Sequence, residues 1–159
     1  MGRRILVSMV LLAVALATAC SSGPVRRISE PAASIQQLAV QADGSWALSL
    51  RLQNYSSIPM RFEATELEVT VGGQSAGTLR YRPDLEIGPE SADVVAVDMQ
   101  PDSAARMLLA DALAAGRGVD YALEGTIDAS PTDRGSSRSY KVTRKSALSP
   151  APGLPGVLR

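Results

Sequence analysis

The order of hydrophobic and polar residues divides the chain into an apolar leader, a long alternating stretch and an end rich in proline and glycine. Residues 5–16 are apolar apart from Ser8, and from residue 35 onward hydrophobic residues recur mainly at every second position. Alternation with period two is typical of β-strands that are buried on one face. The pattern therefore predicts a domain built mainly from β-strands.

Two glycine turns each join a pair of alternating segments, which predicts two β-hairpins. Asp43-Gly44 separates the first pair and Gly72-Gly73 separates the second. Glycine allows the positive φ that tight hairpin turns need. The predicted strands cover residues 35–42, 46–53, 61–71, 77–82, 93–100, 119–128 and 138–145, with a short extended piece at 85–87.

One segment repeats its hydrophobic residues at helical spacing. Asp102 or Ser103 can cap the start of this helix, and Gly116 can end it. About seven strands with one helix near 102–115 predict an all-β fold, an antiparallel β-sandwich like that of immunoglobulin or fibronectin type III domains. The chain has a single cysteine, so we expect no disulfide inside this sandwich.

The leader has the three parts of a signal peptide. Arg3 and Arg4 supply positive charge, residues 5–16 supply the apolar run, and small residues follow up to Cys20. The run is too short to cross a bilayer as a helix, which takes about 20 residues. We therefore predict that residues 1–19 are a signal peptide and are removed.

The end of the leader, Leu16-Ala17-Thr18-Ala19-Cys20, resembles a bacterial lipobox. In a lipobox the cysteine thiol receives a diacylglyceryl group, and cleavage then exposes the cysteine as the new N-terminus. The resemblance implies that Cys20 is the lipid attachment site, carrying covalent diacylglycerol and an N-acyl chain such as palmitate. Such a multiply acylated end would hold a small domain on a membrane.

A second processing enzyme fits the same bond. Lipoboxes usually have leucine where Ala17 stands, and Ala17-Thr18-Ala19 also matches ordinary signal peptidase, which would leave Cys20 unmodified. We favour lipidation because a lone cysteine directly after a signal peptide is otherwise hard to explain in a secreted chain.

The mature chain divides into three predicted parts. Residues 20–34, with two prolines, a glycine and four serines, are the lipidated cysteine and a tether. Residues 35–147 are the β-sandwich. Residues 148–159, with three prolines and two glycines, are predicted to be a disordered tail.

Charge gives the mature chain no general attraction to nucleic acid. Without Arg3 and Arg4, 14 Lys and Arg face 16 Asp and Glu. The acidic residues concentrate between residues 63 and 133, whereas the chain from Arg134 onward is basic. This distribution predicts an acidic domain body with a basic last strand and tail.

The residue types argue against an enzyme. There is no histidine, which excludes Ser-His-Asp triads and histidine metal sites. Asp120, Glu124 and Asp128 share one strand face, but neighbours stand about 13 Å apart, too far to share an ion. Glu66 and Glu68 are about 7 Å apart, within the range of glycosidase pairs, but an exposed strand face offers no cleft. We predict no catalytic residue, no cofactor and no metal.

A leucine-rich segment at 46–52 is followed by Gln53-Asn54, Ile58-Pro59 and the alternating segment 67–71. In this pattern, much of the chain resembles the late embryogenesis abundant type 2 domain, also called the water stress and hypersensitive response (WHy) domain. Asn54 matches the first residue of the family's Asn-Pro-Asn motif, with Tyr55 and Ser56 at the other two positions. The family implies an immunoglobulin-like sandwich, a loose association with desiccation and stress protection, and no catalytic residue. Its bacterial members are often small lipoproteins. The segments that carry the likeness are 46–52, Gln53-Asn54, Ile58-Pro59, 67–71, Gly73, Gly77, Gly88-Pro89, 93–99 and 119–127.

Two functional hypotheses follow. In the first, the protein is a membrane-anchored, non-catalytic protective or binding module. In the second, it is an interaction subunit of the cell envelope that binds a partner's strand or an apolar ligand. Ser21 stands where many inner-membrane lipoproteins carry aspartate, so by resemblance we expect the periplasmic face of the outer membrane.

Overall fold

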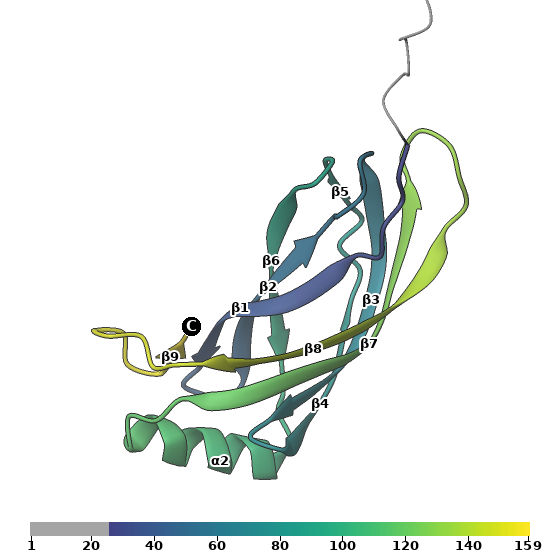
Figure 1. Cartoon of the computed structure of the whole chain (residues 1–159). Helices are drawn as coiled ribbons and strands as arrows, with labels where there is room; N and C mark the ends of the chain where they lie inside the picture. Colours follow the sequence, from purple (N-terminus) through teal and green to yellow (C-terminus); the bar gives the residue numbers. More distant parts are fainter. Residues whose placement is uncertain (1–25) are drawn as a thin grey trace, which may run out of the picture.

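The computed structural model describes residues 26–159 as two antiparallel β-sheets that pack face to face, with one helix at one end (Figure 1). This confirms the predicted all-β sandwich. The first sheet has the order β6-β2-β1-β9, and the second has the order β4-β3-β7-β8, with β5 also paired to β3. The elements are β1 Ala32–Val40, β2 Trp46–Gln53, β3 Met60–Val71, β4 Gln74–Tyr81, β5 Leu85–Ile87, β6 Ala92–Met99, α2 Ser103–Ala114, β7 Val119–Pro131, β8 Arg138–Leu148 and β9 Val157–Leu158.

Both predicted hairpins are present. β1 pairs with β2 through the turn at Gly44, and β3 pairs with β4 through Gly72 and Gly73. All three glycines have positive φ, which explains why glycine occupies these turns. The two hairpins fall in different sheets.

The core lies between the sheets and follows the predicted alternation. On β2, Leu48, Leu50 and Leu52 are at most 1% exposed, whereas Arg51 on the other face is exposed. β3 and β7 supply the opposite side of the core through the same alternation. The largest fully buried side chains are Trp46, Phe62, Leu38, Leu48, Leu50, Leu52, Met60, Leu67, Leu79, Leu109, Leu123 and Ile127.

The predicted helix is α2, which packs on the end of the sandwich at the β3–β4 hairpin. Ala105, Leu109 and Ala112 are its buried residues, in agreement with the spacing of 3.6. Asp102 occupies the N-cap position, but its side chain makes no capping hydrogen bond. Its carboxylate instead accepts a hydrogen bond from the Ser75 hydroxyl at 3.4 Å, so the predicted side-chain cap is wrong.

The predicted tether, residues 20–34, is wrong over its described part. β1 begins at Ala32 rather than at residue 35, and the backbone amides of Arg27 and Ser29 donate hydrogen bonds to Ser57 and Ser56. The prolines and serines of this segment therefore follow the surface of the domain, because neighbouring loop groups satisfy its backbone. Cys20 and the rest of the predicted tether lie outside the described residues.

The predicted disordered tail, residues 148–159, is also wrong. Leu148 ends β8, Ser149 and Arg159 exchange two backbone hydrogen bonds, and Leu158 pairs with Leu38 of β1. The prolines and glycines build a reversal, since Gly153 and Gly156 have positive φ. The reversal returns the chain to the first sheet, where Leu158 is 0% exposed.

We expect Leu158→Ala to lower the free energy of unfolding by about 2 kcal/mol, because it removes a buried side chain from a site near the chain end that can partly collapse. Leu154→Ala is the matched control. Leu154 is 44% exposed in the same segment, so its truncation should change stability by less than about 0.5 kcal/mol. Urea unfolding followed by Trp46 fluorescence measures both, and equal values would contradict the docked tail.

Candidate functional site

The carboxylates singled out from the sequence, Glu66 and Glu68, are exposed on β3. The Glu66 carboxylate on β3 accepts a hydrogen bond from the Arg80 guanidinium at 2.9 Å. This hydrogen bond, with the charge of Arg80, holds the pKa of Glu66 below its ordinary value. Glu68 takes part in none of the ion pairs found within residues 26–159. Instead it lies directly opposite Glu124 of β7 in the strand register.

These carboxylates lie apart on the exposed outer face of the second sheet. Glu66, Glu68 and Glu124 are exposed on the outer face of the second sheet. Asp120 and Asp128 lie farther along β7, four residues to either side of Glu124, as the spacing predicted. Within residues 26–159, no group of three or more carboxylate or thiol residues is placed to hold a metal ion. The outer sheet face therefore offers solvated charges.

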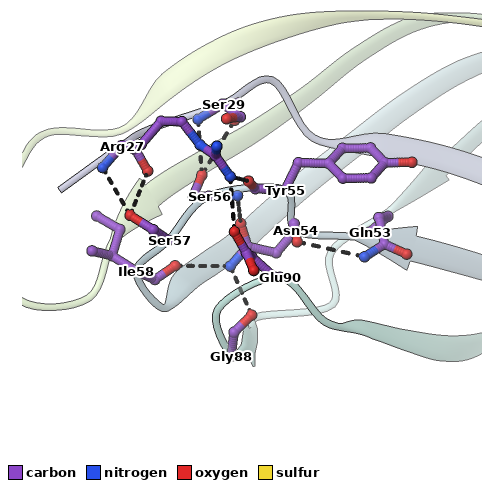
Figure 2. A network of polar contacts seen from close by, with 10 residues as sticks. All are labelled: Arg27, Ser29, Gln53, Asn54, Tyr55, Ser56, Ser57, Ile58, Gly88 and Glu90. Atoms are coloured by element: carbon purple, nitrogen blue, oxygen red, sulfur yellow. Dashed lines mark hydrogen bonds and ion pairs between the residues drawn. The ribbon is translucent and has the colours of Figure 1, made fainter. Parts of the chain in front are cut away.

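A buried polar network lies where the chain enters the sandwich (Figure 2). At its centre is Asn54, which follows β2 and is 1% exposed. The Asn54 amide nitrogen lies 2.9, 3.0 and 2.8 Å from the carbonyl oxygens of Ile58, Ile87 and Gly88. The Asn54 side-chain oxygen accepts the backbone N–H of Ser56 at 2.8 Å. One side chain thus ties the β2–β3 loop to the segment after β5.

The same loop receives the entering chain. Ser56 is a fully buried residue, and its hydroxyl accepts a hydrogen bond from the backbone N–H of Ser29 at 3.0 Å. The Ser57 hydroxyl accepts the backbone N–H of Arg27 at 2.8 Å. The Arg27 guanidinium forms an ion pair with Glu90 at 2.8 Å and donates to the Tyr55 carbonyl at 3.3 Å. Figure 2 shows the Arg27 side chain lying across the loop toward Glu90.

A further contact ties the entering chain to the β7–β8 loop. The Arg26 guanidinium pairs with Asp133 at 3.2 Å and donates to the backbone carbonyl of Arg134. Residues 26–29 are therefore held by two loops that are far apart in the sequence. We call the end of the sandwich formed by loops 54–58, 88–91 and 132–137 the entry end.

Comparison with known proteins finds similar solved structures but no matching family. No family model matches the chain, and no curated protein matches its sequence. A crystal structure of a protein from Archaeoglobus fulgidus is similar at a TM-score of 0.43 and 11% identity, over 79% of this chain and 98% of that one. A solution structure of a protein from Arabidopsis thaliana is similar at a TM-score of 0.48 and 10% identity, over 79% of this chain and 81% of that one.

At the entry end, Asn54 and Ser56 connect segments of the backbone. The donors and acceptors of Asn54 and Ser56 are satisfied by the protein itself, so they hold loops together. Sequence reasoning had singled out Asn54 only through the family motif. It missed Ser29 and Ser56, whose partners are 27 positions away in the chain and carry no local signal.

In the described residues, no helix is long and apolar enough to span a bilayer.

Proposed function

We propose that this protein is a lipoprotein of the bacterial cell envelope, anchored through acylated Cys20, whose β-sandwich is a non-catalytic protective or binding module. The observation that carries the proposal is the lipobox-like Leu16-Ala17-Thr18-Ala19-Cys20 at the end of a signal-like apolar run. The absence of histidine from the chain and the exposed position of Glu66 and Glu68 support a non-catalytic module. We place it at the periplasmic face of the outer membrane on the basis of Ser21.

We further propose that the module belongs to the WHy family and serves in stress or desiccation tolerance. The arrangement of Asn54 supports this assignment. The first position of the family motif supplies the amide that joins two loops, whereas Tyr55 contributes its backbone carbonyl and Ser56 its backbone N–H and hydroxyl. Asn54 therefore makes these hydrogen bonds with Tyr55 and Ser56 at the other two positions of the motif.

The anchor is tested by intact mass and phase partitioning. We expect membrane-extracted wild-type protein to carry diacylglyceryl and N-acyl mass on Cys20 and to enter the detergent phase. Cys20→Ser should lack the acyl mass and stay in the aqueous phase, because serine has no thiol to alkylate. A mature wild-type protein that begins at Cys20 without acyl mass would reject the lipoprotein proposal.

The second candidate function is an envelope interaction subunit, and the open edge of β6 favours it. β6 pairs only with β2 among the described strands, so its other side presents backbone groups to which a partner strand could add. A deletion strain and a detergent pull-down separate the two functions. Sensitivity to drying with no stoichiometric partner supports the protective module, and a stoichiometric partner with normal drying tolerance supports the interaction subunit.

A further inference from the structure

The described chain starts at one end of the sandwich, and α2 lies at the other. Figure 1 shows the start of the described chain beside the β7–β8 loop and opposite α2. β7 connects these ends, since it runs from Val119, just after α2, to Pro131, just before the loop held by Arg26. Its 13 residues, at about 3.3 Å each, separate the two ends by about 40 Å.

The distance available between Cys20 and this end is short. Six residues lead from Cys20 to Arg26, and six residues extend over at most about 20 Å. Residues 26–29 do not lengthen this linker, because Arg26, Arg27 and Ser29 are bonded to the loops of the entry end. A lipid attached at Cys20 would therefore keep the entry end, and not α2, near the bilayer.

The side chains at the entry end suit a phospholipid surface. Ile28 is 40% exposed at this end, and an exposed apolar side chain can enter the boundary between headgroups and acyl chains. The Tyr55 ring instead lies back along the sandwich, beside Arg51 and Arg144. Asp133 and Glu90 are neutralised by Arg26 and Arg27.

Two arginines nearby are not neutralised in this way, Arg134 in the β7–β8 loop and Arg138 at the start of β8. Arg134 and Arg138 take part in none of the ion pairs found within residues 26–159. Both are exposed. Unpaired cations beside an anchored chain are attracted to anionic headgroups.

We propose that the entry end lies against the surface of the bilayer and that α2 points away from it. This orientation rests on the proposed anchor at Cys20. It makes loops 54–58, 88–91 and 132–137 inaccessible to soluble partners. The face available to other envelope proteins is then the α2 end together with the open edge of β6.

The test measures the distance of two labels from lipid headgroups. Acylated Cys20 has no free thiol, so an introduced cysteine is the sole labelling site. Ser136→Cys places a fluorophore at the entry end, and Met107→Cys, at a residue 72% exposed on α2, is the matched distal position. Each full-length lipidated protein is inserted into vesicles of phosphatidylethanolamine and phosphatidylglycerol that contain a headgroup nitroxide.

We expect quenching at position 136 to exceed quenching at position 107 severalfold. Equal quenching at the two positions, or stronger quenching at 107, would overturn the orientation. Arg27→Ala should leave vesicle binding intact but reduce the difference, because it loosens the docked segment. An unchanged difference would reject the role given to Arg27.

Failure of the anchor gives a different result from failure of the orientation. Without acylation, the wild-type protein would itself react with a maleimide at Cys20 and would not float with the vesicles. That outcome would reject the proposed function. Flotation with no thiol reactivity and no difference between the two labels would reject only the orientation.

Discussion

Gly125→Ala should lower the free energy of unfolding by about 3 kcal/mol or more, because two central strands would have to separate. A Cβ atom on Gly125 of β7 would lie 2.1 Å from the Glu66 carbonyl oxygen and 3.0 Å from Leu67 Cα. Both atoms belong to the backbone of β3, so no flexible side chain can move aside. β3 and β7 are neighbours in the middle of the second sheet, and neither can shift without disturbing the core.

Gly73→Ala is the control that separates this clash from the ordinary preference of glycine. Gly73 has φ +79 in the β3–β4 turn, and a Cβ there would meet nothing within 4 Å. Its replacement should cost about 1 kcal/mol through backbone strain alone. Urea unfolding of both variants measures the difference. A cost at Gly125 no larger than that at Gly73 would show that β3 and β7 are not so closely packed.

The second large effect is expected at Asn54. Asn54→Ala leaves three carbonyls and the Ser56 N–H without their side-chain partner, and unpaired buried groups cost about 1–3 kcal/mol each. Since water can reach some of these groups, we expect a loss of about 3 kcal/mol in the free energy of unfolding. Gln41→Ala is the control, because Gln41 is an exposed amide in the β1–β2 turn and its truncation should have almost no effect.

Asn54→Asp adds a dependence on pH that a mere loss of volume would not show. The carboxylate would face three carbonyl oxygens in a buried site, so the pKa of the aspartate should be raised in the folded state above its unfolded value of about 3.9. The protonated form can still donate one hydrogen bond. The folded protein therefore binds the proton more tightly, and stability is lost as pH rises from about 4 through the folded pKa.

The measurement is urea unfolding at several pH values for Asn54→Asp and Asn54→Ala. The difference in stability from wild type should grow with pH for the aspartate variant and stay constant for the alanine variant. A constant difference for both would mean that the side chain at position 54 does not face the carbonyls of Ile58, Ile87 and Gly88.

The fold was predictable from the sequence where the chain follows local rules. The leucines of β2 are buried in alternation, Gly44 and Gly73 mark turns, and the spacing of Ala105 and Leu109 marks a helix. Each of these signals lies within a few residues and depends on the period of a strand or a helix. Such signals can be recognised without knowledge of the tertiary fold.

The predictions failed where the partner of a residue is distant in the chain. Prolines, glycines and serines in residues 26–34 and 148–159 indicated disorder, but Ser29 and Leu158 find partners 27 and 120 positions away. Composition reports whether a segment can order itself, and it cannot report whether another strand or loop will order it. The polar network around Asn54 was not predicted for the same reason, since its acceptors come from two separate segments of the chain.

The pairing of β9 with β1 also bears on when the domain can finish folding. β1 is the first strand of the described chain, and part of its outer edge is covered by Val157 and Leu158. That edge of β1 therefore stays open during folding until Val157 and Leu158 have paired with it. Contacts of such wide sequence separation form slowly. Until then the incomplete sandwich presents a pairing edge that another copy of the chain can reach before Leu158 does.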